Sequence, residues 1–373
     1  MTWKRATLAD LMQDNIVYRN LEPADARIPG LRQSWHLFGM DHYCVPRKTT
    51  REYATALVGF LRQAQALRGV RAPLARLLFI GDTLMNDGTA ARNLGASAPM
   101  LGFIGADRLK EIPKVEVQND LMVANRWTAL ADYLAWVQAS GFPCNEGTAL
   151  LIDLDKTSLG PRGRNDKVID AARVRAMERT LRDALGGRFD EAAFRTVYDP
   201  LNQPEYHYFT ADNQDYLAYM ALMSTAGIVG ADELWAALKG GAMRTVEQFA
   251  SLCEARRERM GPALRAAHDE VRRGIAAEDP TPFKAFRRAE YQETVASMDV
   301  LPDDAAEADV LAREIVITAE VASVAVRLAA QGVLVFGISD KPDEASLPAP
   351  ADAARGAQPI HRARMKVQGA TIA

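Results

Sequence analysis

The chain has 373 residues, 48% of them hydrophobic, which is enough to bury a large core and favours two domains. Its formal net charge of −3 gives no electrostatic reason to expect a nucleic-acid partner. Three widely spaced cysteines (Cys44, Cys144 and Cys253) exclude a disulfide framework and favour a reducing, cytoplasmic location, and the lack of a run of about eighteen apolar residues predicts no membrane partner.

The first part of the chain predicts irregular structure, then a strand and a helix. Residues 1–30 mix charge with proline and predict irregular or short helical structure. Residues 34–43 are interpreted as a possible strand, and residues 50–68 carry apolar side chains at helical spacing. The apolar run 77–80 predicts a buried strand that ends just before Asp82.

The following segments continue this alternation. Residues 88–95 fit a short helix closed by a glycine, and residues 99–104 fit another buried strand. A helix bearing Trp and Leu is expected over residues 120–140, and the apolar run 149–152 predicts a further strand. Strands that alternate with helices in this way are typical of a parallel α/β sheet.

Two of the predicted strands end in acidic residues. Asp153 and Asp155 follow the run 149–152, and Asp82 and Asp87 follow the earlier run. Reactive groups collect at the carboxyl ends of parallel strands, so these acids are expected to share one crevice, where they repel each other unless a cation joins them. Mg²⁺ prefers oxygen ligands and is the cofactor that this pattern predicts. Asp87 has an alternative role as the start of the next helix, since an acid is favoured there.

The second half of the chain has a different composition. Residues 161–310 are almost all helix-forming, with only short breaks. Within them, residues 206–209 form a polar-aromatic cluster that either lines a pocket or packs among helices. Residues 309–331 predict one more helix, and the apolar run 333–338 predicts a strand. The tail from residue 347 is expected to be surface structure.

Four segments match, in residue type and in position relative to the predicted strands, the motifs of one enzyme family. They are Asp-x-Asp-x-Thr over residues 153–157, Gly81-Asp82 followed by Asp87, the strand end at Ser339, and Lys48 ahead of the strand that precedes Asp82. In these motifs the chain resembles the haloacid dehalogenase (HAD) superfamily of phosphohydrolases. The motifs run third, fourth, first and second, which indicates a circular permutation with new termini between the second and third strands of the parent fold.

The resemblance implies a fold and a domain order. The fold is an α/β Rossmann-like parallel sheet, a circularly permuted HAD-like core, with a large all-helical cap domain. The implied segments are 1–110 (core with the third and fourth motifs), 111–147 (connecting helix), 148–160 (core strand with the first motif), 161–310 (helical cap) and 311–373 (core with the second motif, and the tail).

The resemblance also implies a role for each acid. Asp153 would be the nucleophile, forming an aspartyl phosphate, and Asp155 would protonate the leaving oxygen and then activate water. Mg²⁺ would be held by Asp153, the main-chain carbonyl of Asp155, and Asp82, with Asp87 in support. An acid at position 155 is what haloacid dehalogenases proper lack, so dehalogenation is not expected.

Phosphate binding is assigned to residues of other types. Lys48 and Ser339 would bind the phosphate and belong, with Asp153 and Asp155, to the catalytic residues. Thr157 is a further candidate substrate-binding residue. Arg162, just past the first motif, is interpreted either as a substrate-binding residue or as part of a solvated loop. The phosphate-binding base has two rivals to Lys48, namely Arg47 and Lys341.

We therefore expect a Mg²⁺-dependent HAD-like phosphoric monoester hydrolase that acts on a small phosphorylated metabolite. Two alternatives stay open: a phosphotransferase or mutase of the same fold, and a non-catalytic binding protein that retains the fold. The pattern of an EF-hand fails because Ser158 and Arg164 stand where glycine and glutamate are needed, and no P-loop string occurs. The physiological substrate and the oligomeric state are not predicted.

Overall fold

The computed structural model describes residues 2–372 and divides into two compact units. The first, here called the α/β unit, comprises the chain up to Ala171, Thr294–Leu347 and the chain from Asp352 on. The second, here called the helical unit, comprises Ala172–Glu293 and Pro348–Ala351. Among the described residues, no helix is long and apolar enough to cross a membrane.

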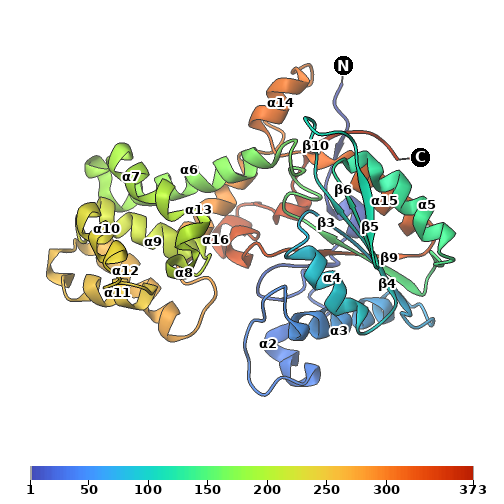
Figure 1. Ribbon diagram of the computed structural model, residues 1–373, viewed down its shortest axis with the longest axis horizontal. Coiled ribbons are helices and arrows are strands. Elements are labelled where there is room, and N and C mark those ends of the chain that lie inside the picture. The colour runs from blue at the N-terminus through green and yellow to red at the C-terminus, as the bar shows by residue number, and fades with distance from the viewer. Residues whose placement is uncertain (1, 373) are drawn as a thin grey trace. The chain divides into compact units, whose positions relative to one another are not determined.

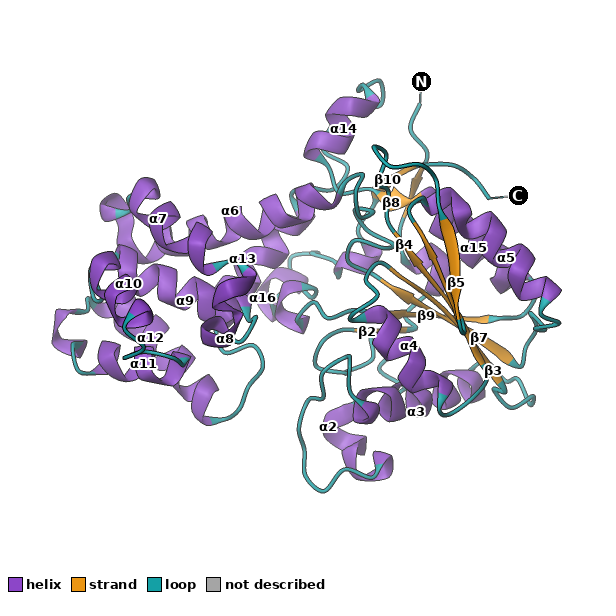
Figure 2. Ribbon diagram, in the orientation of Figure 1, coloured by secondary structure: helices purple, strands orange, loops and turns teal. Residues whose placement is uncertain are grey.

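A seven-stranded sheet forms the centre of the α/β unit (Figures 1 and 2). Every neighbouring pair of strands is parallel except the last, which is antiparallel. The predicted α/β class is therefore confirmed. In sheet order the strands are β2 (Ile16–Val17), β9 (Leu334–Ile338), β7 (Thr148–Asp153), β3 (Arg76–Gly81), β4 (Met100–Gly105), β6 (Leu121–Ala124) and β5 (Val115–Gln118).

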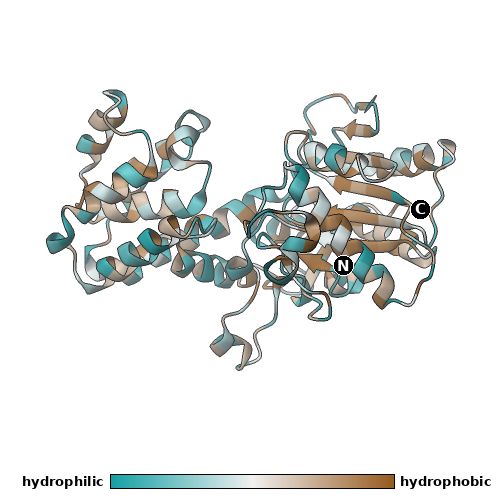
Figure 3. Cartoon of the chain, turned by 90° about the horizontal axis from the view of Figure 1, so that it is seen from below, coloured by the Kyte–Doolittle hydropathy of each residue, from teal (hydrophilic) through white to brown (hydrophobic). Residues whose placement is uncertain are grey.

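The central strands are buried because their sequences are almost continuously apolar. All residues of β7 and β9 are buried, as are those of β3 after Arg76. Figure 3 shows the strands of this sheet in the brown of hydrophobic residues. Parallel strands covered on both faces need such runs, since neither face meets water.

Helices cover both faces of this sheet (Figure 1). One face carries α3 (Arg51–Leu67) and α4 (Asp87–Gly95), and the other carries α5 (Leu130–Ala139) and α15 (Ala319–Ala330). Thr50 caps α3 by accepting a hydrogen bond from the Tyr53 N–H at 3.3 Å. The cap matters for function because it fixes the start of α3, just after Lys48.

A small second sheet brings both ends of the chain together. It contains β1 (Arg5–Ala6), β10 (Met365–Gln368) and β8 (Ile317–Thr318), with β10 in the middle. The Lys366 ammonium is buried there, 2.9 Å from Glu314 and 3.2 Å from Asp299. The prediction that the tail is surface structure is wrong at this point, since Lys366 is buried and pairs with the buried Glu314 and the half-buried Asp299, both distant in sequence.

The helical unit consists of helices that pack around their own apolar core. Buried aromatic residues, among them Phe194, Tyr219, Phe249 and Phe283, form part of that core. The buried Arg287 lies 2.6 Å from both Asp215 and Glu290, so its charge is compensated. The helices that form or enter this unit are α6 (Asp166–Leu185), α7 (Glu191–Leu201), α8 (His207–Thr210), α9 (Gln214–Thr225), α10 (Ala231–Lys239), α11 (Val246–Glu254), α12 (Pro262–Ala276), α13 (Lys284–Val295) and α16 (Pro350–Ala353).

The polar-aromatic cluster at residues 206–209 mostly packs within this unit. The Tyr206 ring lies 5.6 Å from the Trp235 ring, and the buried Phe209 meets Phe249 edge-on at 6.5 Å. Tyr208 is exposed. Packing among helices therefore accounts for two of the three aromatic residues.

Several predicted elements in the α/β unit differ from those observed. Residues 34–43, interpreted as a strand, contain the end of α2 (Leu31–Ser34), a single 3₁₀ turn and irregular chain. The helix predicted over 120–140 is shorter, because its first residues form β6, which pairs with β5 as a hairpin. The segment 111–147 is thus a hairpin followed by a helix. Short apolar runs fit either period, and tertiary pairing decides between them.

The helix predicted over 309–331 is divided into three elements. They are α14 (Glu307–Arg313), β8 and α15, with β8 paired to β10. The first thirty residues are more ordered than predicted, since they hold β1, α1 (Ala9–Met12) and the sheet strand β2. Strands of two residues leave no periodic signal in a sequence.

Candidate metal centre

Three neighbouring strands deliver polar side chains to one edge of the large sheet. Asp153 is the last residue of β7, Asp82 follows β3, and Ser339 follows β9. Asp153 is paired in register with Ile338 of β9, so Ser339 lies one residue beyond it on that side. On the other side Ile80 pairs with Ile152, which places Asp82 just beyond the level of Asp153. The edge is the one that parallel α/β sheets use for ligands.

Three carboxylates from this edge form one compact group. Oxygens of Asp82, Asp87 and Asp153 all lie within 4.8 Å of one another. Asp87 is 1% exposed and Asp153 5% exposed, and the Asp82 side chain is 6% exposed. Buried acids at this spacing repel one another and offer a set of hard oxygen ligands. The donor set fits a divalent cation.

Gly81 allows Asp87 to reach this group. A Cβ atom at position 81 would lie only 2.5 Å from the Cβ of Asp87, so any larger residue would displace the acid. Asp87 begins α4, yet its carboxylate turns back and accepts hydrogen bonds from the Asp82 N–H at 3.1 Å and the Thr83 N–H at 2.9 Å. Asp87 therefore starts the helix, as one interpretation predicts, and also belongs to the acid group, while its role as a metal ligand stays a prediction.

Lys48 joins two of the acids. Its ammonium lies 2.5 Å from Asp153 and 2.6 Å from Asp87, and the side chain is 4% exposed. Arg47, its neighbour and rival, is exposed. Lys341 is buried, and its backbone N–H donates to the Ser339 hydroxyl at 2.9 Å. Lys48 is thus a candidate base in direct contact with two acids of the group.

Burial and mutual charge shift the pKa values of these residues. Burial tends to lower the pKa of Lys48, but Asp153 and Asp87 hold that pKa well above its usual value. Burial tends to raise the pKa of Asp87, and Lys48 with the local hydrogen bonds outweighs it, giving a pKa of about 2. Burial, aided by Asp87, raises the pKa of Asp82 to about 7. Burial also holds the pKa of Asp153 well above its usual value, against the effect of Lys48.

These shifts predict that cation binding strengthens as the pH rises toward about 7. Below the raised pKa of Asp82, about 7, a cation must displace the proton of that carboxyl, so Asp82 alone should make the apparent affinity for Mn²⁺ fall by about tenfold per pH unit. The raised pKa of Asp153 should add to this fall. The native state keeps this proton longer than the unfolded chain, so the contribution of Asp82 to stability is present at low pH and is lost as the pH rises through about 7.

Isothermal titration calorimetry with Mn²⁺ at a series of pH values measures this dependence. The variant Asp82→Asn is the control, since it should bind more weakly and lose the part of the slope that Asp82 contributes between pH 7 and the ordinary carboxylate range. An affinity that is independent of pH over that range in the native chain would contradict the assignment of the raised pKa to a ligand.

The other predicted site residues differ in burial and in hydrogen bonding. Asp155 is half-buried, and no hydrogen bond or ion pair from the described residues reaches its carboxylate, which is not a member of the acid group. Thr157 is fully buried, and its hydroxyl has no hydrogen-bond partner in the part of the chain that the structure describes. Ser339 is buried, and its N–H donates to the Val17 carbonyl at 3.0 Å. Arg162 donates to Asp82 through its Nε.

Sequence reasoning missed Tyr53. Its hydroxyl is buried and has no hydrogen-bond partner among the described residues. Burial raises the pKa of this hydroxyl, the Lys48 charge opposes the rise, and the charges of Asp340 and Asp153 add to it. An unpaired buried hydroxyl costs free energy, so Tyr53 is a candidate ligand-binding residue. The residue lies five positions after Lys48, but in the sequence it counts only as part of the apolar face of a helix.

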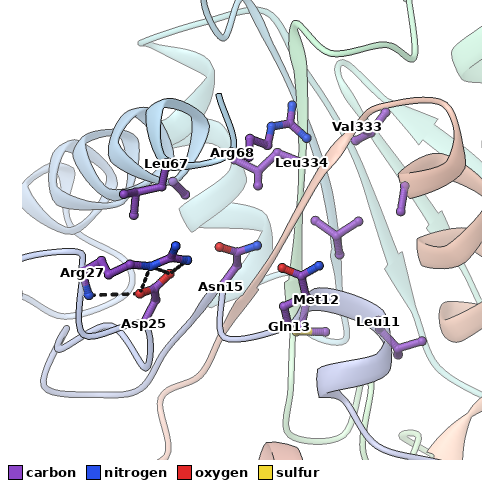
Figure 4. A pocket seen from close by; sticks show the side chains of 13 residues that line it. Leu11, Met12, Gln13, Asn15, Asp25, Arg27, Leu67, Arg68, Val333 and Leu334 are labelled. Atoms are coloured by element: carbon purple, nitrogen blue, oxygen red, sulfur yellow. Dashed lines mark hydrogen bonds and ion pairs between the residues drawn. The ribbon is translucent and has the colours of Figure 1, made fainter. Parts of the chain in front are cut away.

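The pocket in Figure 4 lies elsewhere in the α/β unit. Its lining includes Leu334, the first residue of β9, together with Asn15, which precedes β2, so it opens at the amino ends of these strands. Asp25 and Arg27 at its rim pair with each other at 2.6 Å. The acid group is at the carboxyl ends, and this pocket therefore has no part in it.

Comparisons of the chain with protein-family models, with curated proteins and with solved structures found no match.

Proposed function

We propose that the chain is a Mg²⁺-dependent phosphatase of the HAD type, which hydrolyses a small phosphorylated metabolite through an aspartyl phosphate. The observation that carries this proposal is the position of Asp153. It ends the central strand β7, pairs with Lys48 at 2.5 Å and shares an acid group with Asp82 and Asp87. A nucleophilic carboxylate, a cation site and a fixed positive charge are the groups that phosphoryl transfer requires.

The strand order supports the permuted arrangement. With new termini between the second and third parent strands, the first strand of the chain in this sheet should lie beside the last one. β2 does lie beside β9, in parallel. The strands that carry the fourth, first and second motifs, β3, β7 and β9, are consecutive neighbours in the sheet. The helical unit, inserted between β7 and β9, takes the place of a cap that would select the leaving group.

The chain's own groups divide the chemistry between them. Asp153 attacks phosphorus and forms the aspartyl phosphate, while Asp155 gives a proton to the leaving oxygen. Asp155 then takes a proton from the water that attacks the phosphoenzyme. Its half-buried carboxylate, which has no partner among the described side chains, is accessible for both transfers. Lys48 orients Asp153 and holds positive charge beside it.

A divalent cation supplies charge neutralisation for the acids and for the phosphoryl oxygens. Asp82, Asp153 and the main-chain carbonyl of Asp155 would hold it, with Asp87 in support. Ser339, buried at the end of β9, would donate its hydroxyl to the phosphate.

Release of free phosphate from a broad panel of phosphomonoesters tests this function. We expect release with Mg²⁺ and none with excess EDTA, because the acid group cannot accept a phosphate dianion without a cation. Transfer of phosphate to an added alcohol or sugar without free phosphate would favour a phosphotransferase. No turnover of any substrate, under conditions in which the chain binds Mg²⁺, would contradict the proposal.

A further inference from the structure

Arg162 is held in a fixed place at the edge of the acid group. Its N–H donates to the Lys156 carbonyl at 2.8 Å, and its own carbonyl accepts hydrogen bonds from the Asp107 N–H at 2.8 Å and the Trp127 indole at 3.3 Å. The next residue, Gly163, packs so tightly that a Cβ there would lie 1.9 Å from the Asp107 carbonyl oxygen. The backbone of Arg162 is therefore anchored, and only its side chain is free to move.

The side chain of Arg162 connects the acid group with solvent. Its Nε donates to Asp82, whose side chain is 6% exposed, whereas the arginine side chain is 36% exposed. Within the part of the chain that the structure describes, its two terminal nitrogens have no hydrogen-bond or ion-pair partner. The planar guanidinium thus uses one N–H donor, and its two terminal nitrogens stay available to bind a pair of phosphate oxygens.

The charge balance indicates that Arg162 and a divalent cation compete for the Asp82 carboxylate. Three carboxylates face two cations, Lys48 and Arg162, which leaves one negative charge when all are ionised. A divalent cation would change that to one positive charge, and two positive groups on the Asp82 carboxylate repel each other. Binding of the cation must therefore weaken the hold of Arg162 on Asp82, and by reciprocity Arg162 must weaken cation binding.

We propose that Arg162 exchanges one anion for another: it neutralises Asp82 until a divalent cation takes that carboxylate, and it then binds the phosphoryl group of the substrate. This step rests on the proposed phosphatase function. It makes the phosphate subsite dependent on the cation, so that a phosphorylated ligand binds in order after the metal. A positively charged phosphate subsite then exists only when the cation is present.

Direct binding measurements on Arg162→Ala and Arg162→Gln test this exchange. Calorimetry with Mn²⁺ should show about tenfold tighter binding for both variants than for the native chain, since a competing charge is gone. Inorganic phosphate, titrated in saturating Mg²⁺, should bind about tenfold more weakly to both. Arg108→Ala, which removes an exposed arginine paired with Glu111, is the control and should change neither affinity.

Opposite changes in the two affinities, tighter for Mn²⁺ and weaker for phosphate, distinguish this exchange from a structural role of Arg162. If both variants bound Mn²⁺ equally or more weakly than the native chain, Arg162 would be a positioning residue for Asp82 and the exchange would be overturned. That result would leave the phosphatase function intact. If the native chain bound no Mn²⁺ at all, the exchange and the proposed function would both fail. Arg162→Gln keeps a polar but shorter, uncharged side chain, so it tests the exchange if Arg162→Ala alone fails to fold.

Discussion

Asp153→Asn should abolish phosphate release and lower kcat by about 10⁴-fold or more, because an amide cannot attack phosphorus. Removing the nucleophile from a set of residues that act together lowers kcat by this order. The variant should stay folded. An amide at this buried position removes one of three mutually repelling carboxylates and leaves Lys48 paired with Asp87 at 2.6 Å. Phosphate release is measured with the best substrate of the panel, and folding by circular dichroism.

The matched control for this variant is Asp120→Asn, an exposed acid of the same unit, which should retain native activity. Activity of Asp153→Asn within tenfold of the native chain would mean that another residue is the nucleophile. In that case the pairing of Lys48 with Asp153 would have only a structural purpose.

The second large effect is expected at Lys48. Lys48→Met leaves two buried carboxylates without their shared cation, and breaking a buried pair in this way costs about 3–5 kcal/mol of unfolding free energy. Urea unfolding in EDTA measures the loss. Arg47→Met is the control at the adjacent exposed position and should change stability by less than about 0.5 kcal/mol.

A double variant tests whether the loss comes from uncompensated charge. Lys48→Met combined with Asp87→Asn should be more stable than Lys48→Met alone, because one of the orphaned charges is removed. Equal stability of the single and double variants would indicate that Lys48 contributes by packing and not by its charge.

The apolar runs and their acidic ends were sufficient to place the central sheet and the acid group. The sequence predicts that the strands β3, β7 and β9 are buried, because they carry almost no polar residue. Asp82, Asp153 and Ser339 stand at their ends. Parallel pairing then brings these ends together whatever their order along the chain. The grouping of Asp82 with Asp153 needed only this rule and did not need the family resemblance.

The features that sequence reasoning missed depend on tertiary contacts. β2 has two residues in a segment rich in charge, and it becomes a strand only because β9 lies beside it. The exposed strand β5 forms only as the partner of β6. The contact of Arg162 with Asp82 joins residues eighty positions apart, and the burial of the Tyr53 hydroxyl depends on packing that no periodicity records.

The most direct test of the account is to trap the phosphoenzyme. The chain would be quenched in acid during turnover of its best substrate with Mg²⁺, then cleaved and mapped by mass spectrometry. The account predicts a phosphoryl group on Asp153, absent when EDTA is added and absent from Asp153→Asn. A phosphoryl group on any other residue, or none under conditions in which phosphate is being released, would contradict it.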